Sequence, residues 1–327
     1  MKKFTLTIAA LIASLFIFQA CQEEIELDLP PNEPELVVEA YLSDLDIFIP
    51  QSDLTCPGTD ITFSKDTLQL IALFASFFPV DSVENVADFF PFKKVVLTTT
   101  ADYFSNATPP AVSGATVDLY ENDVLVETLI EDASIPGTYR ITHNPENGNE
   151  YFIRIKALGN EYETTPELYE SVPPIAQIDA VYGPNFIGDS SIYTMALSTI
   201  EQQGEGDFYR WMFYLNNKYV SSPSNIATTN DQGLDGLCLL GFDVYGSQLE
   251  LSDTLAVFQM KITEDFFNYT NTIRTQTAFV GSPFDSPPAP VTGNVKNLTT
   301  GKNAYGYFAA AAISANVLII PDTVPAP

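Results

Sequence analysis

The sequence predicts a mainly β protein built as two β-sandwich-like lobes, and three observations support this fold class. Apolar residues make up 46% and aromatic residues 12% of the 327 residues, enough to form a sizeable buried core. Short runs rich in Thr, Val, Ile and Tyr alternate between apolar and polar positions, which is typical of half-buried strands. Turn residues separate these runs at intervals of roughly eight to twelve residues, as in sandwiches.

Residues 1–20 have the layout of a secretory signal peptide. Lys2 and Lys3 form a basic start, and the stretch from Phe4 to Phe18 is apolar but too short to span a bilayer. A small residue then precedes Cys21, which resembles a bacterial lipobox. The resemblance implies cleavage before Cys21 and lipidation of its thiol. An ordinary signal peptide with a chance cysteine nearby is the alternative.

Residues 21–34 are acidic and contain proline, and we expect them to form a tether. Gln22, Glu23 and Glu24 follow the anchor cysteine, and the two acids so close to it resemble the export signal of surface-displayed lipoproteins of the Bacteroidetes. Acidic side chains do not attract anionic head groups, so the anchor would depend on its acyl chains. The resemblance implies an outer-membrane protein facing the exterior; a solvated acidic linker is the alternative.

The first lobe is predicted over residues 35–172, beginning with the strand Leu36–Leu42. An insertion near residues 46–92 follows, in which an apolar run precedes a short helix that Asp81 could cap. We expect this insertion to pack on the sheet, the alternative being an apolar face for a partner or for the membrane surface. Turn signals bound the further strands of the lobe: Lys94–Thr99, Ala115–Tyr120, Val124–Ile130, Gly137–Thr142, Tyr151–Leu158 and Glu161–Thr164.

Two motifs of the first lobe refine its fold. The runs Ser113–Tyr120 and Pro136–Tyr139 resemble parts of the transthyretin-like or carboxypeptidase-regulatory-like sandwich. In that fold a Gly-Ala step opens a strand and a Pro-Gly-x-Tyr step turns a corner. The motifs imply a fold and carry no chemistry.

The second lobe is predicted over residues 173–327, after a stiff link at Pro173 and Pro174. Its one helix, Glu264–Thr277, has Thr263 as N-cap, acidic residues in the first turn and an apolar side. Residues 221–248 are expected to form loops. The predicted strands are Ala176–Tyr182, Ser191–Thr199, Tyr209–Leu215, Lys218–Val220, one or two within 249–262, Tyr305–Ala311 and Ala315–Ile320.

Candidate residues for chemistry are few. His143 is the single histidine, so a catalytic triad would have to use it, and no G-x-S-x-G motif is present. A carboxylate pair suited to glycoside hydrolysis stays open among 42 acidic residues, as a signal of low specificity. We therefore expect no enzyme activity and no cofactor.

Metal and disulfide sites have one candidate each. Asp231 and Asp235 lie in a loop whose oxygen-rich composition suits calcium, although it lacks the spacing of an EF-hand, and a plain turn is the preferred alternative. Cys56 and Cys238 could form a disulfide in a secreted protein or remain separate buried thiols.

The chain carries 42 acidic and 14 basic residues, a formal net charge of −28. A field of this sign argues against nucleic acid as a partner and against electrostatic docking on phospholipid. Cationic or metal-bearing partners are compatible with it, as is the plain surface chemistry of a secreted protein.

The last third contains a distinctive series of motifs, Gly281–Asp285, Gly293–Asn297 and Tyr305–Ala310. Together with the acidic leader, the Val-Val-Glu-Ala strand, the Pro-Gly-Thr-Tyr turn and the Val-Pro-Pro link, their order resembles domain-of-unknown-function family 4249. The insertion near 46–92 departs from that family by its length. Gly306, between two tyrosines, is expected to allow a neighbouring strand to approach closely.

The resemblance implies an accessory lipoprotein, because the genes of this family often lie beside TonB-dependent outer-membrane receptors. It assigns no catalytic or binding residues. The expected function is a non-enzymatic capture or accessory subunit of such an uptake system, tied to the outer membrane by its lipid. The alternatives are an adhesin or structural surface lipoprotein without a transport role and, third, a carboxylate-dependent hydrolase.

Overall fold

The computed structural model describes residues 33–43, 54–63, 92–101, 107–184, 191–278 and 291–323. The chain divides into two compact units, residues 1–33 with 102–104, and residues 34–101 with 105–327. Everything below concerns the second unit. The predicted signal peptide, Cys21, nearly all of the tether, most of the insertion near 46–92 and the motif at 281–285 lie outside the described residues.

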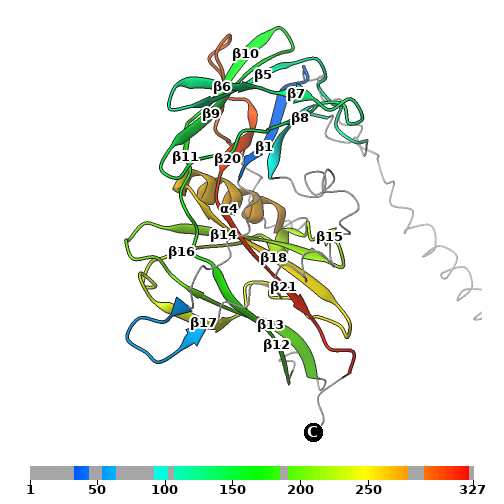
Figure 1. The fold of residues 1–327 in the computed structure, drawn as a ribbon. Helices are drawn as coiled ribbons and strands as arrows, with labels where there is room; N and C mark the ends of the chain where they lie inside the picture. Colours follow the sequence, from blue (N-terminus) through cyan, green and yellow to red (C-terminus); the bar gives the residue numbers. More distant parts are fainter. Residues whose placement is uncertain are drawn as a thin grey trace, which may run out of the picture. The chain divides into compact units, whose positions relative to one another are not determined.

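Two sheets with mainly antiparallel pairing form the part that contains the first strand (Figure 1). The first sheet has the order β20-β1-β4-β8-β7, with bounds Tyr305–Ala310, Leu36–Leu42, Lys93–Thr99, Thr138–Arg140 and Ile130–Glu131. The second sheet has the order β19-β10-β9-β5-β6, and β11 pairs with β9; their bounds are Val295–Asn297, Asn160–Thr164, Glu150–Ala157, Thr116–Glu121, Val124–Thr128 and Glu167–Leu168. Alternate residues such as Val38, Leu97, Leu119 and Ile153 are buried in one shared core.

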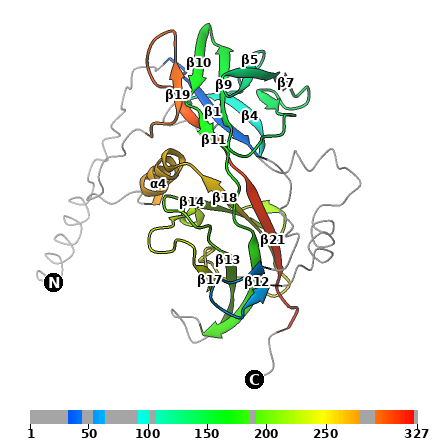
Figure 2. The same cartoon turned by 60° about the vertical axis from the view of Figure 1, so that its left-hand side comes forward.

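Two further sheets form the remainder (Figure 2). One has the order β12-β13-β17, with bounds Ile175–Pro184, Ser191–Ile200 and Cys238–Phe242. The other has the order β15-β14-β18-β21, and β16 pairs with β14; their bounds are Lys218–Tyr219, Phe208–Leu215, Thr254–Ile262, Ile313–Ile319 and Ala227–Asn230. The sheets and the single described α helix confirm the mainly β fold with one helix that the sequence predicts.

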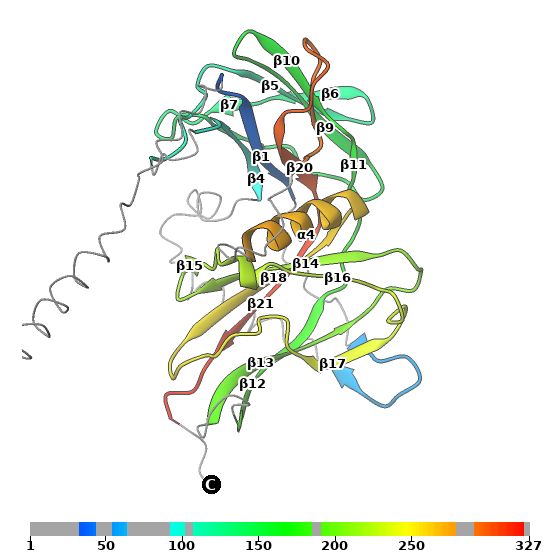
Figure 3. The ribbon, with the colours of Figure 1, turned by 180° about the vertical axis from the view of Figure 1, so that it is seen from behind.

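The sheet around β14 is covered on both faces. Trp211 and Phe213 pack in the same core as the β12-β13-β17 sheet, whereas Met212 and Tyr214, one residue out of phase, pack with helix α4 (Glu264–Ala278). Figure 3 shows α4 lying across this sheet. Thr263 caps the helix as predicted, because its hydroxyl accepts a hydrogen bond from the Phe266 N–H at 3.3 Å. Among the described residues, no helix has the length and apolarity that a membrane span needs.

Three local predictions need correction. The run predicted as one strand at Val124–Ile130 is two strands, because β6 pairs with β5 and β7 pairs with β8 of the other sheet. The stretch 221–248, expected as loops, contains β16, β17 and the short 3-10 helix η2 at Pro223–Asn225. The insertion near 46–92, in which no strand was expected, contains a small hairpin, β2 at Leu54–Thr55 and β3 at Thr62–Phe63.

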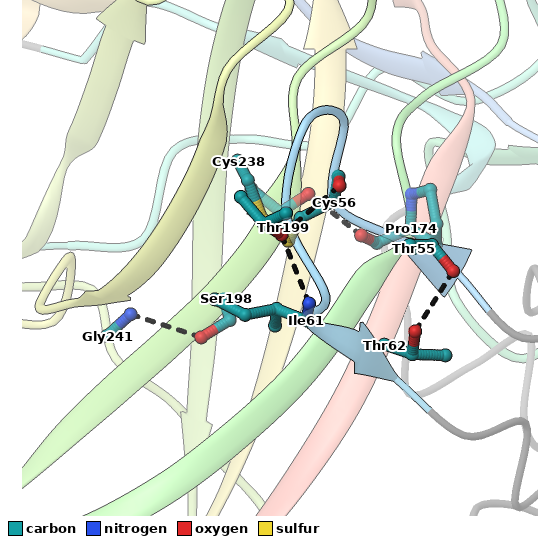
Figure 4. Close-up of a disulfide and its surroundings, with 10 residues drawn as sticks. Thr55, Cys56, Ile61, Thr62, Pro174, Ser198, Thr199, Cys238 and Gly241 are labelled. Carbon is teal, nitrogen blue, oxygen red and sulfur yellow. Dashed lines mark hydrogen bonds between the residues drawn. A yellow bond between two sulfur atoms is a disulfide. The ribbon is translucent and has the colours of Figure 1, made fainter.

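Strand pairing crosses the predicted boundary at Pro173. β20 pairs in parallel with β1, and β19 pairs antiparallel with β10, so strands from the end of the chain complete both sheets of the first part. The β2–β3 hairpin makes the opposite crossing. A disulfide joins its Cys56 to Cys238 of β17, with 5.5 Å between the two Cα atoms and 182 residues of separation (Figure 4).

The β1–β20 pair depends on Gly306. Its φ is +94°, and a Cβ atom added there would lie 1.8 Å from the carbonyl oxygen of Val38. Gly293 packs against the same backbone, because a Cβ there would lie 1.5 Å from the Gly306 oxygen. The close approach expected from the sequence at Gly306 is therefore confirmed.

We predict that Gly306→Ala lowers the free energy of unfolding by about 3 kcal/mol, since the methyl group meets rigid backbone and the φ is unfavourable. Urea unfolding followed by circular dichroism measures the change. Gly301→Ala is the matched control: its φ is also positive, +76°, but a Cβ there has no atom within 4 Å. Equal losses in the two variants would contradict the close-approach argument.

We predict that replacing Cys56 and Cys238 together by serine lowers the free energy of unfolding by about 2–5 kcal/mol, because the disulfide closes a long loop. Reductant should produce a similar loss in the parent protein and no further loss in the double variant. Urea unfolding with and without reductant tests both statements. A parent protein indifferent to reductant would show that the pair adds no stability.

Candidate functional site

A groove of about 650 Å³ lies beside β1 and β14. Its walls come from β1, β4, β14, β15, β20, helix α4 and η2, so it forms only when both ends of the chain have folded. The volume lies within the range of about 300–1,000 Å³ found for small-molecule sites. This groove is the candidate functional site.

Aromatic side chains dominate the wall of the groove. The ring of Tyr307 lies 4.7 Å from Phe266 and 4.9 Å from Tyr269, measured between centroids, and Tyr41 meets Phe266 edge-on at 6.0 Å. Tyr214 and Tyr219 continue the wall on β14 and β15. Contacts of this kind stabilise the wall itself and present ring faces and edges to an apolar or ring-bearing ligand.

A buried arginine is the main polar group of the groove. Arg210 lies on the face of β14 that carries Met212 and Tyr214, and it is only 8% exposed. Its Nη1 donates a hydrogen bond to the Tyr41 hydroxyl at 3.1 Å, and its Cζ lies 5.3 Å from the centre of the Phe266 ring. Among the described residues, its buried Nε has no hydrogen-bond partner.

Two other basic side chains, those of Arg140 and Lys261, form ion pairs with acidic residues. Arg140 lies 2.6 Å from Asp132, and the half-buried Lys261 lies 2.9 Å from Asp207. No ion pair of the described residues includes Arg210, although it is the most buried of these three cations. A guanidinium stays charged at every physiological pH, so Arg210 is a buried cation that no acidic side chain of the described residues contacts, although Glu39 attracts it at longer range.

Two further charged residues line the groove. Glu39 of β1 is exposed, and Lys94 of β4 is half-buried opposite Tyr41 in the strand register. Among the described residues the lining of the groove thus has two cations and one anion, whereas the whole chain has a net charge of −28. Its balance differs in sign from that of the rest of the protein.

A buried carboxylate fixes the position of Tyr307. Glu167 of β11 accepts hydrogen bonds from the Tyr307 hydroxyl at 2.6 Å, the Thr263 hydroxyl at 2.7 Å and the Asn294 amide at 3.3 Å. These donors come from β20, the cap of α4 and the segment before β19. Burial raises the pKa of Glu167 to about 7, against the lowering effect of the three hydrogen bonds.

The metal candidate of the sequence has backbone partners. Asp231 accepts a hydrogen bond from the Gly206 N–H at 2.8 Å, and Asp235 accepts one from Gly204 at 2.7 Å. These hydrogen bonds connect two loops, a structural role that is compatible with a plain turn. No cluster of three or more potential metal ligands occurs in the described parts of the chain.

His143 and the cysteines lie apart from the groove. The Nε2 atom of His143 lies 3.4 Å from the Glu121 carboxylate, which also accepts a hydrogen bond from the Tyr151 hydroxyl at 2.6 Å. Cys56 and Cys238 form the disulfide described above. Of the candidate site residues selected from the sequence, those that the structure describes, His143, Cys56, Cys238, Asp231 and Asp235, do not line the groove.

Sequence reasoning missed Arg210, and one signal could have found it. Phe208–Leu215 is apolar or aromatic on both alternating faces except at Arg210. A single charge in a strand with two buried faces is costly, so such a position marks either an ion pair or a ligand contact. Glu39 carried the same signal in β1, within Leu36–Leu42.

The described residues define a class of protein. It has open, mainly antiparallel sheets and one helix, and these elements enclose an aromatic groove that contains a buried arginine. The profile described as "Domain of unknown function (DUF4249)" matches residues 93–316, and the chain belongs to this family. The match includes Arg210, α4 and Tyr307 but begins after β1. Searches of curated proteins and of solved structures each gave no match.

We predict that Glu167 makes the protein less stable as pH rises. Its pKa, about 7 in the folded state, lies above the usual 4.5, so its contribution is complete below pH 4.5 and is lost as pH rises through 7. The loss should reach at most roughly 3 kcal/mol. Asp265 faces this group and adds to the effect.

Glu167→Gln should remove this part of the pH dependence, because an amide does not ionise. Urea unfolding at several pH values between 4 and 8 gives the difference between parent and variant. Glu161→Gln, on an exposed side chain of β10, is the control and should leave the slope unchanged. Parallel stability curves for parent and Glu167→Gln would refute the assignment.

Proposed function

We propose that this protein is a lipid-anchored outer-membrane protein that captures a small ligand and serves a TonB-dependent receptor without catalysing a reaction. The observation that carries the capture role is the groove of about 650 Å³ with its aromatic wall and its unpaired Arg210. A buried cation without an anion lowers stability, and such a cost is typical of positions kept for binding.

The proposed location rests on the sequence. Cys21 follows an apolar signal-like stretch, and acidic residues come directly after it. Lipidation of Cys21 would hold the folded part close to the outer surface of the membrane, where a captured ligand can reach a receptor. The high negative charge is compatible with this role, because attachment would then depend on acyl chains alone.

A second candidate is an adhesin or structural surface protein. Val124 and Ile130 are 63% and 79% exposed on the edge strands β6 and β7, where backbone groups can pair with another chain. Such edges suit a protein partner. They would serve a receptor contact in the first proposal and attachment in the second.

A mild-detergent pull-down from outer membranes, analysed by mass spectrometry, tests the proposal. We expect a β-barrel receptor to copurify with the parent protein and palmitate to label it. Cys21→Ser should lose both the label and the membrane fraction. Retention of the variant in the membrane with its label intact would refute the anchor, and a parent protein without a barrel partner would favour the adhesin.

A further inference from the structure

We infer that the groove binds an organic monocarboxylate, whose carboxylate is held by the guanidinium of Arg210 and whose ring-bearing or apolar body lies against the aromatic wall. This inference rests on the proposed capture function and names the ligand class of the same site. Four features of the groove lining lead to this ligand class.

The first feature is the open edge of the guanidinium. Tyr41 occupies Nη1 of Arg210, and Nε has no partner. Nε and Nη2 form the other edge of the planar group, and two parallel N–H bonds along such an edge match the two oxygens of a carboxylate. The Nε atom is buried and has no partner in the described part of the chain, and the single edge that it forms with Nη2 suits one carboxylate.

The second feature is the electrostatic environment of that edge. Arg210 is more than nine-tenths buried, and its direct contacts among the described residues are the Tyr41 phenol and the face of Phe266, while the Glu39 carboxylate attracts it only at longer range. Burial also raises the pKa of the Tyr41 hydroxyl, so this phenol stays neutral and keeps a proton to donate. A bound anion would gain a charge-assisted contact and a second donor at the same place.

The third feature is the aromatic wall around the cation. Phe266, Tyr269 and Tyr307 form a continuous group of rings, and Glu167 holds the Tyr307 hydroxyl in place. Rings surrounding a single charged group favour a ligand with one anionic end and an apolar or ring-bearing remainder.

The fourth feature sets the charge of the ligand. Glu39 is an exposed acid in the lining and repels any negative charge placed near it, whereas Lys94 attracts it. A ligand with one negative charge can place it at Arg210 and keep its neutral part beside Glu39. A phosphate or a dicarboxylate would bring a second charge closer to that acid, so we favour the monocarboxylate.

Isothermal titration of the folded protein with paired probes tests the inference. The probes are benzoate, phenylacetate, 4-hydroxyphenylacetate and indole-3-acetate, each with its primary amide, together with inorganic phosphate. We expect at least one acid to bind at least ten times more tightly than its amide and than phosphate. An amide that binds as tightly as its acid, or phosphate that binds more tightly, would overturn the carboxylate inference and leave capture itself intact.

Three variants show whether the contact is the one described. Arg210→Met should abolish the preference for the acid over the amide, and thermal unfolding checks that the variant is folded. Lys94→Gln should weaken binding of the acid about twofold to fivefold, and Glu39→Gln should strengthen it by a similar factor. Both side chains are at least partly exposed, so these two variants stay informative even if Arg210→Met does not fold.

The signs of the variant effects separate the possible failures. A groove with a purely structural arginine predicts equal effects on acid and amide in every variant, which would overturn the inference. Absence of binding by all acids, all amides and phosphate would overturn the inference and the capture function together. Opposite signs for Glu39→Gln and Lys94→Gln would support a bound anion at this place.

Discussion

The parallel pairing of β1 with β20 is the contact on which the rest of the structure depends. It joins residues 37–42 to residues 305–310 and places Glu39 beside Tyr307 in the register. The pairing is possible because Gly306 brings its backbone against Val38, where any side chain would collide. The groove has walls from both strands, so the candidate site exists only through this long-range contact.

Two buried charges near the groove are handled in opposite ways. Glu167 accepts three hydrogen bonds from neutral donors, so its oxygens are satisfied, and burial still raises its pKa to about 7. Arg210 donates one hydrogen bond from Nη1, and its buried Nε has no hydrogen-bond partner among the described residues. They do not pair with each other, although Arg210 lies over the ring of Phe266 and Glu167 bonds Tyr307, whose ring contacts that of Phe266. The acid therefore organises the wall, whereas the base has no acidic contact among the described residues.

The covalent link acts at the other end of the molecule. The Cys56–Cys238 disulfide fixes the β2–β3 hairpin to β17 (Figure 4). β17 belongs to the β12-β13-β17 sheet, which packs against the sheet that contains β14. β19 and β20, from the end of the chain, complete the two sheets that contain β10 and β1. The β2–β3 hairpin, from the beginning of the chain, is attached by the disulfide to the sheet that contains β17. These reciprocal crossings explain why the predicted boundary at Pro173 does not coincide with a boundary in strand pairing.

The local part of the structure followed from local signals. Period-two alternation of apolar residues predicted most strands, and the Thr263 cap together with an apolar side predicted the helix. Gly306, between two tyrosines, predicted the close approach of a neighbouring strand. The family was also recognisable from the sequence, because the order of its short motifs can be read without knowing which residues are in contact. Prediction failed where one run feeds two sheets, as at β6 and β7, since alternation does not record a change of partner.

The sequence alone determined the strand-rich composition, the position of the helix and the identity of the family. The tertiary structure decided which distant strands pair, that Cys56 meets Cys238, and that Arg210 contacts Tyr41 and Phe266 but no acidic side chain among the described residues. The physical reason is the range of the interactions. Propensity, capping and backbone strain act over a few residues, whereas a groove requires side chains that are brought together only after distant segments have paired.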